Sequence, residues 1–143
     1  DVSSEIRTPE IAYYASRVSA VPEVREFLLN TQRDMAKNGN ILMDGRDIGT
    51  VILPDAPVKI FLTASAQSRA ERRYKELIEK GQQVTMDGIL HDINERDRQD
   101  MTRAVAPLKQ ADDAVLLDTS SLTLEESIAA VLRIIREKTE EKA

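Results

Sequence analysis

Short apolar runs alternate with longer stretches of helical periodicity in this chain, and this alternation constrains its fold more than any other feature. The runs at 41–43, 58–62 and 114–117 are bounded by turn-forming residues, which is typical of buried strands. Strands that are separated by helices form a parallel sheet with helices on both faces. We therefore expect an α/β fold with the element order helix, helix, strand, strand, helix, helix, strand, helix.

Local signals mark where helices begin and end. Thr8 before Pro9 predicts a helix start, because threonine caps helices and proline suits their first turn. Thr123 with Glu126 three residues later forms a capping box. Gly81 is expected to end the helix that begins near 66. These signals are local and do not depend on the rest of the fold.

The spacing of apolar residues predicts which face of each helix is buried. The charged stretch 136–143 is expected to fray as a solvated tail. The residues expected to face the core are Val24, Phe27, Leu28, Thr31 and Met35; Ala66, Ala70, Tyr74, Leu77 and Ile78; Ile89, Leu90 and Ile93; and Leu124, Ile128, Val131, Leu132 and Ile135.

Composition limits the compartment and the classes of partner. The 143 residues, 41% hydrophobic and 31% charged, fit one domain of ordinary composition. No apolar run approaches the ~20 residues of a membrane span. The absence of cysteine excludes disulfides, and a single histidine argues against a structural zinc site. The net charge of −5 argues against nucleic-acid binding, so we expect a cytoplasmic protein without nucleic-acid, membrane or metal-ligating sites.

The segment that follows the first apolar run carries the strongest chemical signal. Asp44-Gly45 ends the run, because glycine turns most freely, and leaves Arg46 and Asp47 on a loop. In open α/β sheets, ligands bind at such loops, beyond the carboxyl ends of the strands. A surface turn with an incidental ion pair explains the segment equally well.

Arginines form a second candidate site. Arg69, Arg72 and Arg73 lie near the start of a helix that follows a strand, where cations oppose the helix dipole. This placement favours an anionic partner, although surface ion pairs with Glu71 and Glu76 account for it equally well. Taken alone, Arg25 is best interpreted as a solvated charge on its helix.

Taken together, these motifs resemble the signature of bacterial cytidylate kinases. The resemblance runs from end to end of the chain, and several motifs in the same order are far more specific than any one of them. The matching segments are 16–25, 44–50, 54–56, 59–62, 69–73, 96–97, 100 and 103–108.

The resemblance implies a P-loop nucleoside monophosphate kinase, which transfers the γ-phosphoryl group of ATP to CMP or dCMP with Mg²⁺. Such kinases have a five-stranded parallel sheet with helices on both sides and a mobile lid, and intact members are monomers. The sequence contains no Gly-x-x-x-x-Gly-Lys-Ser/Thr, so we expect about the C-terminal two-thirds of such a kinase, lacking its first strand and helix. As an isolated chain it would then be a catalytically inactive CMP-binding fragment.

The same resemblance divides the chain into regions. Residues 1–38 would form helices on the monophosphate side and 39–64 the central strands. Residues 65–107 would form the lid region, and 108–143 the last strand and helix. The oligomeric state of the chain itself is left open by the sequence.

Roles for individual residues also follow from the resemblance. A carboxylate accepts from the cytosine amino group and an arginine donates to the ring nitrogen and carbonyl, whereas uracil reverses the donor pattern. An acidic helical scaffold, the alternative, would not explain why these charges lie at the ends of elements. The expected CMP-binding residues are Ser16, Arg25, Arg46, Asp47, Arg96, Asp100 and Arg103, with Arg46 and Arg103 also catalytic and Arg69, Arg72 and Arg73 binding phosphates from the lid.

Overall fold

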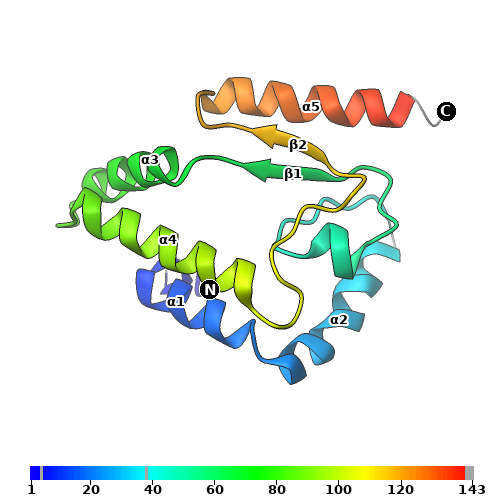
Figure 1. Ribbon diagram of the computed structural model, residues 1–143, viewed down its shortest axis with the longest axis horizontal. Coiled ribbons are helices and arrows are strands. Elements are labelled where there is room, and N and C mark those ends of the chain that lie inside the picture. Colours follow the sequence, from blue (N-terminus) through cyan, green and yellow to red (C-terminus); the bar gives the residue numbers. More distant parts are fainter. Residues whose placement is uncertain (4, 38, 141–143) are drawn as a thin grey trace.

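The computed structural model describes residues 1–143 except 4, 38 and 141–143. It is a mixed α/β arrangement in which a small parallel sheet lies among helices (Figure 1). The elements in chain order are the 3-10 turn η1 (Glu5–Arg7), α1 (Pro9–Val18), α2 (Pro22–Lys37), the π-helical turn η2 (Ile48–Ile52), β1 (Ile60–Thr63), α3 (Ala66–Glu79), α4 (Met86–Thr102), β2 (Val115–Asp118) and α5 (Leu124–Glu140).

The two strands pair in parallel, with Ile60 opposite Val115 and Thr63 opposite Asp118. Just beyond the sheet, the amide and the hydroxyl of the buried Thr119 both donate to the carbonyl of Thr63, at 2.8 and 3.1 Å. Helix α5 runs alongside β2, whereas α1 and α4 lie on the opposite side of the sheet (Figure 1). The expected parallel pairing of the runs near 60 and 115 is therefore confirmed.

The apolar run 41–43 does not form the buried strand that we expected. Ile41 is 44% exposed and Leu42 is 89% exposed. A strand is stable only when its backbone groups bond to a neighbouring strand. Within the described residues, β1 and β2 pair with each other and no strand lies beside this run.

The predicted helix caps are present. The Thr8 hydroxyl accepts from the Ile11 amide at 3.2 Å. The Thr123 amide donates to the Glu126 carboxylate at 2.8 Å, and the Glu126 amide donates back to the Thr123 hydroxyl at 3.2 Å. Gly81 follows α3 with a φ of 73°, a conformation that glycine adopts without steric cost.

Helix α5 is longer than we expected from the sequence: it continues to Glu140. The expected frayed tail is thus wrong for 136–140, and 141–143 lies outside the described residues. Glutamate and lysine are good helix formers, so a charged stretch extends a helix that has already begun. Helix α4 ends at Thr102, before Pro107 as expected.

The buried core of the described residues lies between α3 and α4. Ala70, Leu77 and Ile89 form its centre, and Tyr74, Val84, Met86, Leu90 and Ile93 pack against it. The apolar faces predicted for these two helices are confirmed, except that Ile78 is exposed and Ala66 is half-buried outside this core. The helices meet as an antiparallel pair joined by the short connection after Gly81 (Figure 1).

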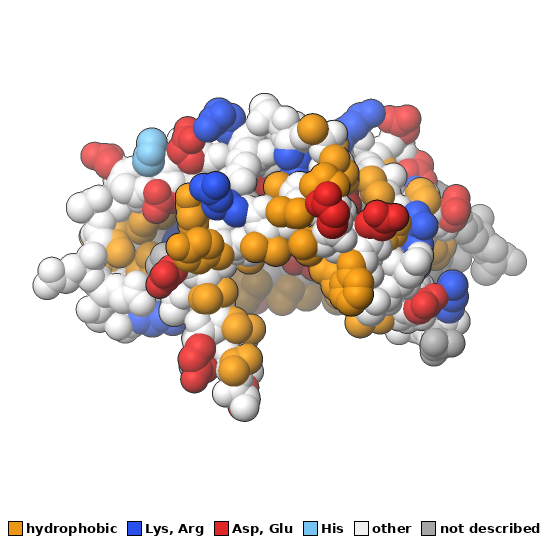
Figure 2. Space-filling model, turned by 90° about the horizontal axis from the view of Figure 1, so that it is seen from below, with side chains coloured by type: hydrophobic (Ala, Val, Ile, Leu, Met, Phe, Trp, Pro, Cys, Tyr) orange, Lys and Arg blue, Asp and Glu red, His pale blue; other side chains and the backbone are white. Residues whose placement is uncertain are grey.

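The apolar faces predicted for α2 and α5 are not buried. Phe27 is 79% exposed and Leu124 is 71% exposed. The buried residue of α5 is Ile134, which lies outside the predicted set, and no described residue of α2 is classed as buried. Periodicity identifies an apolar face but does not say what covers it. Apolar side chains gather in patches on the side of the molecule where α1 and α2 lie (Figure 2).

Among the described residues, no helix has both the length and the apolar character needed to cross a bilayer.

The α3–α4 core yields a test of stability. Leu77→Ala should lower the free energy of unfolding by about 2–3 kcal/mol, because it removes a buried side chain and leaves a cavity. Ile78→Ala, one residue on and exposed, is the matched control and should cost less than about 1 kcal/mol. Urea denaturation measures both values, and equal losses would contradict the assigned core.

Candidate functional site

Five charged side chains form a continuous series of ion pairs, which we call the charge chain. Arg25 pairs with Asp47. The other Asp47 oxygen lies 3.7 Å from Arg103 Nη2, and Arg103 Nη1 lies 4.0 Å from Asp100 Oδ1. Asp100 Oδ2 accepts from Arg46 Nε at 2.9 Å. Groups from α2, from the loop before η2 and from the end of α4 therefore converge on one place.

Backbone contacts explain why Arg103 and Asp100 point into this place. Arg103 follows the last residue of α4, and its Nε donates to the carbonyl of Ala106 at 2.7 Å. Ala106 has a φ of 48°, which turns the chain sharply. The amide of Leu108 then donates to the carbonyl of Asp100 at 2.7 Å. The segment after α4 is thus folded back against the last turn of the helix.

Arg25 and Asp47 are positioned by contacts at the start of α2 and at the start of η2. Arg25 lies in the first turn of α2 and also donates to the carbonyl of Ser19 at 3.0 Å. Asp47 immediately precedes η2 and its carbonyl accepts from the amide of Val51 at 2.9 Å. Both side chains are therefore attached to the ends of regular elements.

The centre of the charge chain is buried. The side chains of Asp47 and Arg103 are each 7% exposed, and that of Asp100 is 5% exposed. Burial lowers the pKa of Arg103, and nearby Arg25 lowers it further, whereas Asp47 and Asp100 raise it. Three guanidiniums face two carboxylates, so the charge chain has one positive charge in excess and is suited to an anion.

Among the residues that the structure describes, two buried side-chain polar atoms have no hydrogen-bond partner. They are the hydroxyl oxygen of Ser16 and Nη2 of Arg103. Buried polar groups are nearly always hydrogen-bonded in native proteins. Because both residues also line a cavity, these two atoms are available to a polar ligand within it.

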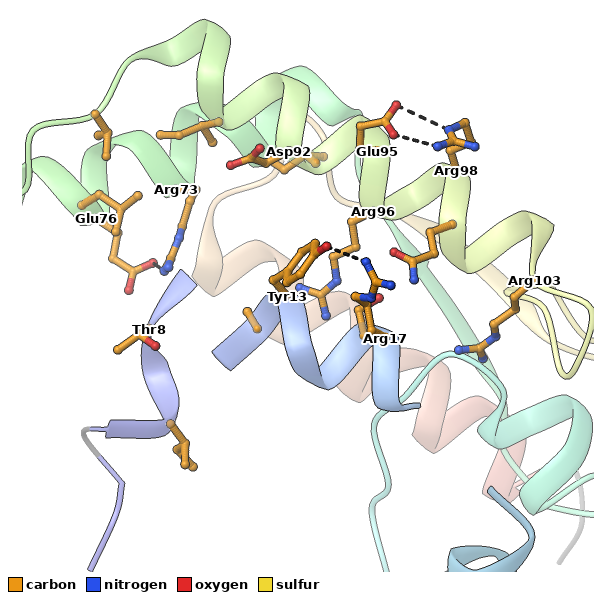
Figure 3. A pocket seen from close by; sticks show the side chains of 18 of the residues that line it. Thr8, Tyr13, Arg17, Arg73, Glu76, Asp92, Glu95, Arg96, Arg98 and Arg103 are labelled. Carbon is orange, nitrogen blue, oxygen red and sulfur yellow. Dashed lines mark hydrogen bonds and ion pairs between the residues drawn. The ribbon is translucent and has the colours of Figure 1, made fainter. Parts of the chain in front are cut away.

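The cavity lies between α1 and the α3–α4 pair and has a volume of about 1230 Å³. Arg96 projects from α4 toward α1, where Arg17 donates to the hydroxyl of Tyr13 at 2.7 Å (Figure 3). Arg103 reaches the same space from the far end of α4 (Figure 3). A smaller cavity of about 460 Å³ adjoins η2 and β1 and is lined by Arg46.

The structure brings five of the seven residues predicted to bind CMP into one charge chain, and the other two line a cavity that Arg103 also lines. Asp47, Asp100, Arg25, Arg46 and Arg103 form the charge chain. Ser16, Arg96 and Arg103 line the larger cavity. Sequence analysis missed Tyr13 and Arg17, because a tyrosine and an arginine four residues apart are common on helix surfaces and carry no specific signal.

The three expected lid arginines do not form one cluster. Arg69 makes a two-bond ion pair with Asp97, at 3.0 and 2.5 Å, and lines the smaller cavity. Arg72 donates to the carbonyls of Thr119 and Leu122. Successive helical residues are about 100° apart, so Arg73 faces the larger cavity instead.

Arg73 makes the ion pair that was the alternative interpretation of this cluster. It donates to Glu76 at 2.7 Å, and Lys80 donates to the other oxygen at 2.5 Å. Hydrogen bonds from Lys80 and then Arg73 lower the pKa of Glu76 to about 2. Glu71, the other expected partner, accepts from Gln67 at 2.9 Å.

Removing one carboxylate tests the charge chain. Asp47→Asn should lower the free energy of unfolding by about 3 kcal/mol, because it leaves buried guanidiniums without compensation. Glu137→Gln on α5 is the matched control: its ion pair with Arg133 is exposed, and its loss should cost less than about 0.5 kcal/mol. Denaturant unfolding at neutral pH compares the two, and equal costs would rule out a buried network.

The ion pairs of Glu76 predict a dependence on pH. Because its pKa in the folded protein lies below the ordinary value of 4.5, the pairs stabilise the fold above that value, and this contribution is lost as the pH falls toward about 2. Lys80→Met should raise the pKa of Glu76, because it removes the strongest donor. An NMR titration of the Glu76 carboxyl carbon measures the shift, and an unchanged titration would contradict the assigned pairing.

Comparison with known proteins adds independent information. A profile of the cytidylate kinase family matches residues 1–137. The chain is 55% identical over 137 residues to a cytidylate kinase of Thermosipho melanesiensis, covering 96% of this chain and 63% of that protein. It is 54% identical over 138 residues to that of Enterobacter sp. strain 638, covering 96% and 61%. The chain therefore spans about 60% of the length of the curated relatives it matches.

Proposed function

Because this chain belongs to the cytidylate kinase family, we propose that it forms the CMP site and lid of an enzyme that transfers the γ-phosphoryl group of ATP to CMP or dCMP. The observation that carries this proposal is the buried charge chain, whose Arg103 lines the larger cavity and whose Arg46 lines the smaller one. Its excess positive charge suits a phosphate, and its carboxylates suit the donor groups of a nucleoside. We also propose a cytoplasmic location, in keeping with the family.

Recognition of the base would rest on Asp47, Arg25 and Ser16. A carboxylate of Asp47 accepts from the exocyclic amino group of cytosine, and the Arg25 guanidinium donates to the ring nitrogen and carbonyl. The free hydroxyl of Ser16 supplies one more bond from the cavity wall. Uracil would place a carbonyl against the carboxylate, which such a site rejects.

Recognition of the phosphate and sugar would rest on the remaining predicted residues, which are Arg46, Arg96, Asp100 and Arg103. Nη2 of Arg103 is free of hydrogen bonds, and the side chain of Arg46 is 42% exposed, so both have donors available to phosphate oxygens. Asp100 accepts from ribose hydroxyls, and Arg96 already points into the cavity (Figure 3). Binding of an anion would replace part of the contact that Asp100 now makes with both arginines.

Catalysis would consist of positioning and charge stabilisation. In phosphoryl transfer a nucleotide phosphate oxygen attacks, so no side-chain nucleophile is required. Arg46 and Arg103 would stabilise the charge of the transferred group. Arg69, Arg72 and Arg73 would act from the lid, provided that closure exchanges their present protein partners for phosphate. The lid would also exclude water.

Mg²⁺ would enter with ATP and not as a resident ion of these residues. Among the described residues, no group of three or more acidic or histidine side chains is placed to hold a metal ion. Mg²⁺ is commonly bound by substrate phosphates with few protein ligands. When bound, it would neutralise charge on the phosphates of ATP.

The fold of the whole enzyme would be a P-loop kinase with a larger parallel sheet. The chain spans about 60% of its relatives, and it contains no phosphate-loop motif. The exposed apolar faces of α2 and α5 and the unpaired run 41–43 would be covered by further sheet and helix. This arrangement would explain why regular apolar patterns lie in solvent here.

A second candidate function follows from the absence of a phosphate-loop motif in this sequence. Without a phosphate loop, the 143 residues by themselves would bind CMP and transfer no phosphate. Calorimetry with CMP and a phosphotransfer assay on this chain distinguish the two properties. Saturable binding without turnover is expected of the chain alone, and turnover by the chain alone would contradict the assigned need for a phosphate loop.

Phosphotransfer from ATP by the full-length protein tests the proposed function. The kcat/KM for CMP or dCMP should exceed that for UMP by about 100-fold or more, because uracil leaves the buried polar groups unpaired. Arg46→Met should lower kcat/KM for CMP about 100-fold. Arg133→Met removes the same charge from an exposed position on α5 and should change nothing. Equal use of UMP would overturn the assignment of the base.

A further inference from the structure

Helix α2 binds the segment that carries Asp47 at two places, through two arginines. Arg25 pairs with the carboxylate of Asp47. Arg33, eight residues later, donates from Nη2 to the carbonyl of Val51 at 2.9 Å and from Nε to that of Ile52 at 3.1 Å. Eight helical residues span about 12 Å, so the two contacts hold both ends of η2 against α2.

The internal bonding of η2 connects these two contacts. The carbonyl of Asp47 accepts from the amides of Val51 and Ile52, at 2.9 and 3.2 Å. The last carbonyls of a helical turn lack partners within the turn, and a cationic side chain satisfies them. Arg33 therefore fixes the end of the turn whose amides hold the backbone of Asp47.

We propose that Arg33 is a positioning residue that sets the place of the Asp47 carboxylate for recognition of the pyrimidine base. The inference rests on the proposed function, because it assigns Arg33 to the CMP site through Asp47. The described hydrogen bonds of the Arg33 side chain go to backbone carbonyls of η2, so its effect on a nucleotide passes through the loop. It belongs to none of the motifs from which the CMP site was expected.

Arginine is required at this position for a geometric reason. Its planar guanidinium presents Nε and Nη2 on one edge, and the carbonyls of Val51 and Ile52 lie side by side to receive them. A lysine ammonium is a single point of charge and holds the pair less rigidly. The side chain of Ile52 is itself buried, so burial of an apolar side chain also helps to hold the turn.

The experiment compares Arg33→Met with Lys37→Met in the full-length protein. Lys37 lies on the same helix, carries the same charge and is exposed. Arg33→Met should raise the KM for CMP about tenfold and lower the preference for CMP over UMP by a similar factor. The KM for ATP and the kcat at saturation should change less than twofold. Lys37→Met should alter none of these values.

Hydrogen exchange gives a second measurement that does not depend on activity. The amides of Val51 and Ile52 should exchange faster in Arg33→Met than in the unsubstituted protein, and those of the α3–α4 core should not. Should Arg33→Met fail to fold, Arg33→Lys keeps the charge and loses the two-point contact. It should shift the KM for CMP in the same direction by a smaller factor.

The outcomes separate the inference from the proposed function. If the unsubstituted protein phosphorylates CMP and the Arg33 variants match Lys37→Met in KM and base preference, the inference is overturned and the function stands. A general loss of stability with unchanged base preference also overturns it, because that result indicates a structural role only. If the unsubstituted protein does not phosphorylate CMP, the proposed function is overturned and the inference with it.

Discussion

The structure depends most on the buried guanidinium of Arg103 between Asp47 and Asp100. A charged group with 7% of its side chain exposed is tolerated only when opposite charges compensate the loss of hydration. Each of these carboxylates holds a further arginine, Arg25 or Arg46. The end of α4, the loop before η2 and the start of α2 are therefore constrained by one another.

Stability alone is a poor explanation for such a network. Buried ion pairs are often no more stabilising than apolar residues of the same volume, and here the balance leaves one positive charge in excess. Arg103 Nη2, within the network, and the hydroxyl of Ser16, in the wall of the larger cavity, make no hydrogen bonds. These features are unfavourable in a closed core and favourable beside a cavity that admits an anionic, polar ligand.

The sequence predicted the features that depend on residues close to one another in the chain. The caps at Thr8 and Thr123, the end of α3 at Gly81 and the apolar face between α3 and α4 follow from short-range patterns and are present. The run 41–43 and the apolar face of α2 were misjudged, because a pattern indicates an apolar surface without indicating its cover. The pair Arg69–Asp97 joins residues 28 apart, and no local signal connects them.

Convergence of the charge chain was expected from the resemblance to the cytidylate kinase family and not from spacing, since its members lie on separate elements. The contact of Arg33 with η2 was not expected at all. The only available signal was that Arg33 lies off the apolar face of α2, a property it shares with any solvated arginine. Backbone carbonyls have no sequence signature, so a side chain that acts on them is found only in coordinates.

The position of Asp100 links the two sides of the site. It contacts Arg103, which lines the larger cavity, and Arg46, which lines the smaller one. One carboxylate cannot fully neutralise two guanidiniums, so each arginine keeps part of its capacity to bind an anion. A phosphate that enters from either side competes with the same carboxylate and leaves it more available to the other arginine. Under the proposed function, this shared carboxylate holds the two arginines near one another, and an anion would take over part of its pairing with them.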